Sequence, residues 1–299
     1  MDLMKDKQNI QNFWGSLYES LYGDNDQNIS RKQLINAIDA MEDMFRHREH
    51  MAAIEMPLLN LVGKKVLEIG PGAGGHSALF AKYGALTTSL DITIERARAT
   101  AKKFKILKAN DCMAMQGDGE NLPFNNECFD IVYSNGVLHH TNDTEAAIKE
   151  VYRVLKPGGR AVIMLYCKSS WHYWINMWFC VGVLKGGLLN GKNWLGQATE
   201  WGGKDKQTLE NPITRCYTNN SINRLFRHFE KLTLRKGEFY FYLIPKLGRL
   251  YRRWQIKRYG VHQGGYLVYG EPWPIQSPLE KYLGRKIGFA WFISAIKPK

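Results

Sequence analysis

Apolar and polar positions alternate along this chain with two different periods. Short apolar and β-branched runs that end at a turn signal are typical of buried strands, and apolar residues spaced three or four apart are typical of helices. Seven such runs predict strands: 66–69, 86–90, 113–116, 129–134, 160–166, 231–238 and 289–296. Helical patterns lie between most of them, among them 219–228. This alternation predicts an α/β fold built on a mostly parallel sheet.

The helix after the fourth predicted strand carries its own start and stop signals. Asn142 and Glu145 have the spacing of a capping box, which opens a helix. Residues 148–155 place apolar side chains on one face, and the Lys-Pro-Gly-Gly sequence at 156–159 is expected to end the helix. The fifth strand should begin directly afterwards.

A glycine-rich turn follows the first predicted strand. Gly70, Gly72 and Gly75 fit the dinucleotide pattern G-x-G-x-x-G, whereas Gly70, Gly72 and Gly74 fit the G-x-G-x-G of S-adenosylmethionine (SAM) enzymes. The glycines alone leave both ligands open. Glu68 favours SAM, because a carboxylate at the strand end would repel a pyrophosphate but suits the ammonium and sulfonium charges of SAM.

Polar side chains follow the next three strands at their carboxyl ends, where open α/β sheets bind ligands. Asp91 lies roughly 20 residues after Gly70, the position from which a carboxylate can bind both hydroxyls of a ribose. Asp118, in the turn after the third strand, is placed to accept a hydrogen bond from an adenine amino group. Asn135 follows the fourth strand.

Five motifs, in order and correctly spaced, make residues 64–166 resemble a class I SAM-dependent methyltransferase. The motifs are VLEIGPGAGG, the LDI around Asp91, GDGENLPF, FDIVYSNGVLHH and EVYRVLKPGG. The last three are similar to the subgroup that modifies small molecules, quinones and sterols.

The resemblance implies a Rossmann-like, seven-stranded, mostly parallel sheet with helices on both faces and a reversed last strand. It implies SAM as the cofactor, S-adenosylhomocysteine as the product and no metal. The motif residues expected to contact SAM are Glu68, Gly70, Gly72, Gly74, Asp91, Ile92, Asp118, Gly119 and Asn135.

The resemblance also divides the chain into three parts. Residues 1–60 are expected to form an N-terminal helical extension and 61–166 the SAM-binding core. Residues 167–299 are expected to complete the core and to carry two substrate-specificity insertions, at about 167–218 and 239–287.

In this family an N-terminal segment often folds over the cofactor as a lid. Aromatic residues fall at helical spacing between 13 and 22. Tyr18 and Tyr22, one turn apart, are the predicted lid residues, because phenols tolerate a partly wet position. Packing of these rings on the surface of the domain is the alternative.

Charge is divided unevenly between the two halves of the chain. Residues 1–150 hold 16 Lys and Arg against 21 Asp and Glu, and residues 151–299 hold 25 against 7. The basic half indicates an acidic partner, which could be an anionic small molecule, a membrane surface or RNA. Residues 246–258 concentrate six of the cations, although a solvated basic helix would look the same.

Residues 171–189 are unusually apolar and aromatic, but Lys185 and the glycines make this run too short to cross a membrane. We expect a buried wall over the substrate pocket, with an interfacial helix as the alternative. Residues 1–11 are polar, so the expected location is the cytoplasm, with peripheral membrane contact left open. The five scattered cysteines indicate reduced thiols and no zinc site.

Methyl transfer needs an acceptor held in line with the donor, and a group to take a proton from a hydroxyl or amine. The candidate catalytic residues lie after the fourth and fifth strands: His139, His140, Tyr166 and His172. Arg215 and Tyr217 are the candidate substrate-binding residues, since an arginine suits a carboxylate or phosphate. Each histidine has a structural role as its alternative.

These patterns predict SAM-dependent methyl transfer to an oxygen or nitrogen atom of a small, anionic or lipid-linked acceptor. An RNA methyltransferase that grips RNA with the basic half is the alternative within the same chemistry. An NAD-dependent oxidoreductase and a non-catalytic SAM-binding protein are the competing classes, and both fit the cofactor motifs less well.

Overall fold

The computed structural model describes residues 3–26, 29–189, 194–199 and 211–299. A seven-stranded sheet forms its centre, with strand order β3-β2-β1-β4-β5-β9-β6. The strands are β1 Lys65–Ile69, β2 Leu86–Asp91, β3 Met113–Gln116, β4 Phe129–Asn135, β5 Leu155–Tyr166, β6 Glu230–Gly237 and β9 Ala290–Ile296. The first five are parallel, and β9 runs antiparallel between β5 and β6. The predicted Rossmann-like sheet with a reversed last strand is confirmed.

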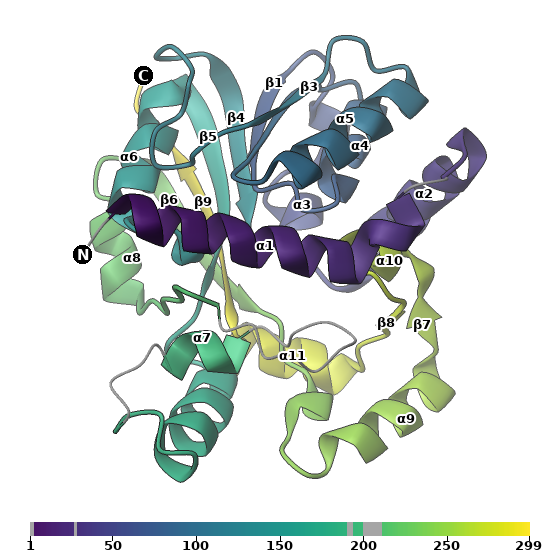
Figure 1. The fold of residues 1–299 in the computed structure, drawn as a ribbon, viewed down its shortest axis with the longest axis vertical. Helices are drawn as coiled ribbons and strands as arrows, with labels where there is room; N and C mark the ends of the chain where they lie inside the picture. Colours follow the sequence, from purple (N-terminus) through teal and green to yellow (C-terminus); the bar gives the residue numbers. More distant parts are fainter. Residues whose placement is uncertain (1–2, 27–28, 190–193, 200–210) are drawn as a thin grey trace.

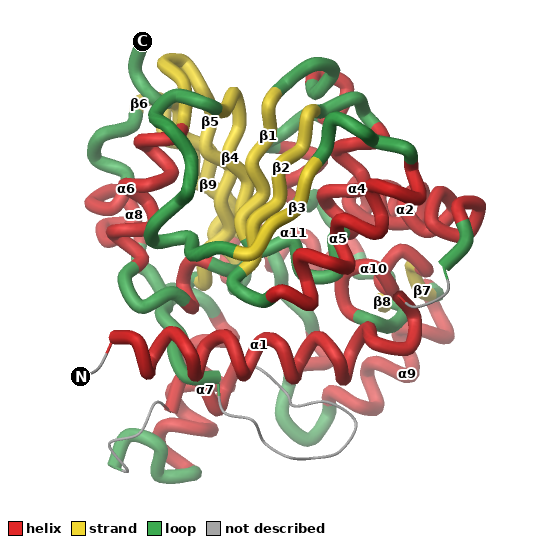
Figure 2. The backbone as a smooth tube through the Cα atoms, turned by 45° about the horizontal axis from the view of Figure 1, so that its top comes forward, coloured by secondary structure: helices red, strands yellow, loops and turns green. Residues whose placement is uncertain are grey.

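Helices cover both faces of this sheet (Figure 1). They are α1 Leu3–Asp26, α2 Arg31–His47, α3 Met51–Ile54, α4 Gly75–Lys82, α5 Ile94–Leu107, α6 Thr144–Val154 and α8 Asn219–Leu225. Short 3-10 turns η1 Leu58–Asn60 and η2 Leu138–His140 join them to the strands. Helices α6 and α8 lie on one side of the sheet, and α2 to α5 lie on the other (Figures 1 and 2).

Two apolar cores follow from the period of two in the strands. Leu67 of β1 and Ile163 of β5 pack in the core under α6 and α8. Their neighbours Val66 and Val162 point to the opposite face, into the core shared with α2, α3 and α4. The N-terminal region is therefore divided, because α2 and α3 belong to the second core while α1 lies across the front of the molecule (Figure 1).

Two details of the helix before β5 differ from the sequence interpretation. The N-cap of α6 is Asp143, whose carboxylate accepts hydrogen bonds from the backbone N–H groups of Glu145 and Ala146, so Asn142 is not the cap. The helix ends at Val154, and residues 155–159 already belong to β5. Asn142 and Asp143 are both residue types that cap helices, and the position of Glu145 alone did not show which of them is the N-cap.

The two insertions lie together beyond the carboxyl ends of the strands. The first holds a π-helix, η3 His172–Leu184, and α7 Trp194–Thr199. The second holds η4 Phe241–Leu243, α9 Gly248–Tyr259, η5 Gln263–Gly265, α10 Tyr266–Tyr269 and α11 Pro278–Ile287, with a small sheet of β7 Val261–His262 and β8 Trp273–Pro274. Its segment η5 packs directly on α2, where a Cβ at Gly264 would lie 2.3 Å from the Met41 Cα.

Candidate functional site

The carboxyl edge of the sheet opens into a cavity of about 590 Å³. One half of its wall is made by the turns that follow β1, β2, β3 and β4. The other half is made by α1 and by residues of the two insertions. Sheets of this type bind ligands at this edge, and the volume lies in the usual range for small-molecule sites.

The glycine turn forms the floor of the first half. Gly70 has φ +74°, and a Cβ there would lie 2.3 Å from Val137 Cγ2, so no other residue fits this turn. Gly70 and Gly72 line the cavity. Gly74 does not line it, because it caps α4 and lies against the backbone of Thr100.

Glu68 lies behind this turn and does not line the cavity. Its carboxylate is almost fully buried and accepts a hydrogen bond from the Ser77 hydroxyl. The other oxygen lies 3.5 Å from His76 Nδ1, and His76 does line the cavity. Glu68 is therefore placed to act on a ligand through His76, and not by direct contact as the sequence predicts.

Asp91 and Ile92 line the cavity at the end of β2. The Asp91 Oδ1 atom accepts hydrogen bonds from the backbone N–H (2.9 Å) and hydroxyl (3.0 Å) of Thr93, which leaves Oδ2 for a ligand. Burial raises the pKa of the Asp91 carboxyl, and the Arg96 guanidinium opposes this shift. A buried carboxylate with one oxygen held in place suits a pair of ribose hydroxyls.

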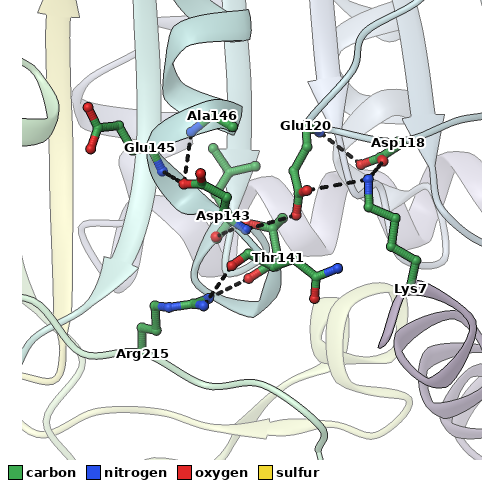
Figure 3. A network of polar contacts seen from close by, with 10 residues as sticks. Lys7, Asp118, Glu120, Thr141, Asp143, Glu145, Ala146 and Arg215 are labelled. Atoms are coloured by element: carbon green, nitrogen blue, oxygen red, sulfur yellow. Dashed lines mark hydrogen bonds and ion pairs between the residues drawn. The ribbon is translucent and has the colours of Figure 1, made fainter. Parts of the chain in front are cut away.

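Asp118 and Gly119 line the cavity at the turn after β3, and Lys7 of α1 is bound to Asp118 and Glu120 (Figure 3). The Lys7 ammonium donates to the Asp118 carboxylate and lies 3.4 Å from Glu120 Oε2. Asp118 Oδ1 also accepts from the Glu120 backbone N–H at 2.9 Å. The carboxylate predicted to meet an adenine amino group thus also holds the N-terminal helix.

One face of α1 covers the cavity, but it is not the face predicted. The residues that line the cavity are spaced three or four apart: Lys7, Ile10, Trp14 and Leu17. Tyr18 is buried on the neighbouring face against Ala73 and Ala99. The side chain of Tyr22 lies outside the described residues. The spacing of apolar residues predicts the helix. Which of its two aromatic faces lines the cavity depends on how α1 packs against the rest of the protein, and the sequence does not show this.

His140 is the predicted catalytic residue with the most informative contacts. It lines the cavity, and its Nδ1 lies 2.8 Å from the carbonyl oxygen of Ile213. The carbonyl only accepts and so favours hydrogen on Nδ1 with a lone pair on Nε2, whereas the side-chain nitrogen of Asn211, a donor 3.0 Å from Nδ1, favours the opposite tautomer. We assign the first tautomer, because the carbonyl is the nearer of the two. Nε2 is buried and has no hydrogen-bond partner in the part of the chain that the structure describes. Burial lowers the pKa of His140 to about 4.

The other candidates at these strand ends have different positions. His139 is fully buried and does not line the cavity, and its ring packs against that of Tyr166 at a tilt of 37° with 3.8 Å between the centroids. Tyr166, His172 and Asn135 do line it. Burial lowers the pKa of His172 to about 4, and its Nδ1 lies 2.8 Å from the side-chain nitrogen of Asn176.

The structure places Arg215 and Tyr217, the predicted substrate-binding residues, outside the lining of the cavity. The Arg215 guanidinium donates to the carbonyl oxygens of Thr141 and Asn142, the latter at 2.7 Å, and so fixes the loop before α6 (Figure 3). Tyr217 is a buried member of the core under α6 and α8. Neither residue lines the cavity. The segment that holds both residues precedes α8, and their position there suggested a place at the cavity. The Arg215 side chain instead binds backbone carbonyls, and the Tyr217 side chain packs in the core.

The second insertion supplies an aromatic wall that sequence reasoning missed. We give this name to Tyr240, Tyr242, Tyr269 and Trp273, which all line the cavity. Tyr269 and Trp273 stack with centroids 3.8 Å apart, and Tyr240 and Tyr242 stack at 5.1 Å. The indole N–H of Trp273 is buried without a partner among the described residues. The many aromatic residues between 239 and 273 could have indicated a binding site, but their spacing does not show that they line the cavity.

A fully buried arginine holds this wall in place. Arg48 donates to both carboxylate oxygens of Glu238 (2.8 and 2.6 Å) and to the hydroxyls of Tyr269 (2.6 Å) and Tyr240 (2.5 Å). Its guanidinium carbon also lies 5.3 Å from the centroid of the Trp273 ring. A buried guanidinium with this many acceptors is well compensated, so it fixes the relative positions of α2 and the wall.

Comparisons with known proteins agree with this site. Residues 67–163 match the model of a methyltransferase domain. The chain is 33% identical over 108 residues to a demethylmenaquinone methyltransferase of Streptomyces griseus, a match covering 36% of this chain and 45% of that protein. It is 33% identical over 105 residues to a sterol 4-C-methyltransferase of Caenorhabditis elegans, covering 35% of this chain and 31% of that protein. The chain thus spans less than half of the length of these relatives.

A solved structure extends the likeness to the fold. A phosphoethanolamine N-methyltransferase of Haemonchus contortus, in complex with SAM, superposes with a TM-score of 0.52 at 17% identity, over 96% of this chain and 60% of that one. Residues 67–163 thus match a methyltransferase domain, and the sheet around them has the Rossmann-like methyltransferase fold.

The cavity has features that suit SAM, the cofactor of proteins with this domain. Gly70 lines the cavity, and Asp91 keeps its Oδ2 atom for the ribose. Asp118 lies in the same lining, with Oδ2 bonded to Lys7 and Oδ1 to the Glu120 backbone N–H, so an adenine amino group would use a second lone pair of one of these oxygens. The aromatic wall lies in the other half of the cavity, which leaves that half for the acceptor.

Removing residues 1–28 from the protein is expected to weaken SAM binding by at least roughly tenfold, or about 1.4 kcal/mol. The cut removes Lys7 and Trp14 from the cavity wall but keeps Ser30, which caps α2. Circular dichroism should show a folded protein, and titration calorimetry should show the weaker binding. Unchanged affinity in the truncated protein would mean that α1 only packs on the surface.

Proposed function

We propose that this protein transfers the methyl group of SAM to an oxygen or nitrogen atom of a small molecule. The observation that carries the proposal is the line of Gly70, Asp91 and Asp118 along one edge of a cavity that also holds His140. The first three residues match what the ribose and adenine of SAM require. The fourth has a buried Nε2 without a partner among the described residues, and we assign this atom the contact with the bound acceptor.

Bound SAM supplies an electrophilic methyl group, and the rest of the chemistry falls to this chain. The sheet edge and α1 hold the donor, and the aromatic wall holds the acceptor beside it, so that the reacting atoms meet in line. As the new bond forms, the acceptor hydroxyl or amine loses its proton, and His140 Nε2 is the group we assign to accept it. Helix α1 and the insertions form the outer wall of the cavity in which this reaction takes place.

The aromatic wall also bears on the kind of acceptor. Four rings and the cavity-lining side chains of Leu267 and Phe289 favour a molecule with a flat or apolar body. Arg215, the residue that suggested an anionic acceptor, is bound to backbone carbonyls. We therefore propose an uncharged acceptor in place of an anionic one, and retain a lipid-linked molecule as a member of this class.

Asp91→Ala is expected to weaken SAM binding by about 1.5–3 kcal/mol, the scale for losing hydrogen bonds to a charged group. Titration calorimetry should show micromolar-range binding of SAM and S-adenosylhomocysteine to the unchanged protein, and none of NAD. Asp111→Ala, which removes an exposed carboxylate from the loop before β3, is the matched control and should bind normally. Binding of NAD without binding of SAM would overturn the proposal.

The acceptor itself can be found by transfer of a labelled methyl group from SAM to the components of a cell extract. Labelled products in the organic-soluble fraction would support an apolar acceptor. A label that appears only in RNA would instead support the alternative in which the basic half of the chain binds nucleic acid.

A further inference from the structure

The first insertion exposes an unusual amount of apolar surface. Within η3, only Tyr173, Met177 and Gly182 are buried. The apolar side chains that face solvent on η3 and just after it are Trp174, Ile175, Trp178, Phe179, Val183, Leu184, Leu188 and Leu189, with Trp174 48% and Leu184 67% exposed. The predicted buried wall is thus only one side of this segment. Contiguous apolar surface of this kind marks a site that binds a partner.

Helix α9 in the second insertion combines exposed apolar and basic side chains. Leu247, Leu250 and Trp254 are spaced three and four apart, so they form one stripe along the helix, and Trp254 is 51% exposed. The exposed cations that accompany the stripe are Lys246, Arg249, Arg253, Lys257 and Arg258. The helix contains no acidic residue.

Arg252 does not belong to this exposed set. It donates to Glu271 at 2.8 Å, and its guanidinium carbon lies 5.9 Å from the centroid of the Tyr242 ring. Its role is therefore within the fold, next to the aromatic wall. The cations available to a partner are the ones on the outer side of α9.

Both helices lie at the same end of the molecule. In Figures 1 and 2, η3 below α7 and α9 on the other side form the end that points away from the sheet. The two insertions are tied together there, because the Asn176 side chain of η3 donates to the carbonyl oxygen of Leu243 at 2.8 Å. We call the exposed apolar and basic side chains of η3 and α9 the docking face.

We propose that the docking face binds the surface of an anionic lipid bilayer. Interfacial helices combine Trp and Leu with Lys and Arg in this way, since the rings and aliphatic chains enter the headgroup region while the cations meet anionic lipids. RNA would use the cations and the rings, but it offers nothing to Leu184, Leu250 or Leu247, whose aliphatic side chains lie in the same surface.

The docking face also borders the proposed acceptor half of the cavity. His172 at the start of η3 and Leu243 before α9 both line that cavity. A docked protein would therefore turn this end of the cavity to the membrane, where an apolar acceptor is concentrated. This last step rests on the proposed function, whereas bilayer binding by itself does not.

Among the described residues, no helix is long and apolar enough to cross a membrane. The proposed contact is therefore tested as peripheral binding. The full chain is sedimented with vesicles of phosphatidylcholine alone, and with vesicles of phosphatidylcholine and phosphatidylglycerol in equal parts, at low and at high salt. We expect binding to the anionic vesicles only, and weaker binding at high salt because the charges are then screened.

Two variants test the two parts of the docking face. The variant Arg249→Gln, Arg253→Gln, Lys257→Gln should lower the partition coefficient on the order of 100-fold, given the attraction of each cation to an anionic surface. The variant Trp174→Ser, Trp254→Ser should also lose binding, and its folding can be checked by circular dichroism. Arg98→Gln, Lys105→Gln, Lys108→Gln removes three exposed charges from α5 and its C-cap, which lie apart from η3 and α9, and should bind as the unchanged protein does (Figure 1).

Three results would overturn the proposal. They are no binding to anionic vesicles at low salt, equal losses in the α9 and α5 variants, and a concentration-dependent dimer that the Trp174 and Trp254 substitutions dissociate. SAM binding is measured on the same preparations. Normal SAM binding without vesicle binding would contradict the docking face alone, and absent SAM binding would contradict the proposed function.

Discussion

Replacing Arg48 with methionine is expected to lower the free energy of unfolding by about 3–5 kcal/mol, the scale for removing one partner of a buried ion pair. Burial alone would lower the pKa of the Arg48 guanidinium, but Glu238 and the two tyrosines raise it well above its ordinary value, so the group stays charged. Methionine leaves the Glu238 carboxylate and the hydroxyls of Tyr240 and Tyr269 without their donor. Urea unfolding measures the change.

Three further variants show whether the loss of stability comes from the Arg48–Glu238 ion pair or from any substitution in this region. Arg31→Met removes an exposed arginine from the start of α2 and should change stability by less than about 0.5 kcal/mol. Glu238→Gln should be destabilising like Arg48→Met, because it leaves the other charge buried. The double variant Arg48→Met, Glu238→Met should recover part of the loss. If Arg48→Met proved as stable as Arg31→Met, the network would contribute nothing to the fold.

Replacing His140 with asparagine is expected to lower kcat by about 10²–10⁴-fold, the usual contribution of a proton-accepting side chain. Asparagine can still donate a hydrogen bond to the Ile213 carbonyl, as His140 Nδ1 does, but it has no atom in the place of Nε2. The measurement is turnover of the acceptor identified from extract, together with SAM affinity by calorimetry. SAM affinity should stay the same, because the predicted loss lies in proton transfer.

The pH profile provides a second test of the same role. The pKa of His140 is lowered to about 4, first by burial, which outweighs the hydrogen bond to Ile213. The imidazole is therefore neutral above about pH 5, and the rate should stay level from neutral pH down to that point and fall only as pH approaches 4. His139→Phe, which keeps a ring against Tyr166, should retain most of the turnover. Full activity in the asparagine variant would show that His140 only supports the fold.

The parts of the protein that could be predicted are those set by local pattern. The strands up to residue 166 follow from apolar runs that end in turns, and Gly70 and Asp91 are fixed to the cavity by their place at the ends of β1 and β2. The reversed last strand came from resemblance and not from spacing. For the strands up to residue 166, Gly70 and Asp91, the residues nearby in sequence carry the whole signal.

The parts that could not be predicted depend on contacts between distant segments. Trp14 and Tyr18 lie on one helix, and only the docking of α1 on α5 decides that Trp14 meets the cavity. Arg215 looked available until its partners, the carbonyls of Thr141 and Asn142, were known. The pairing of Arg48 with Glu238 joins residues 190 positions apart, and no local pattern indicates it.

The position of β9 in the sheet constrains the order in which the protein can fold. This strand lies between β5 and β6 and hydrogen-bonds to both, yet it follows them in sequence after the whole second insertion. During synthesis β6 therefore has no sheet to join, and β5 presents an open edge, until that insertion has left the ribosome. The growing chain thus carries an unpaired strand and the apolar η3 together for this interval, which makes it a natural client for chaperones that bind nascent chains.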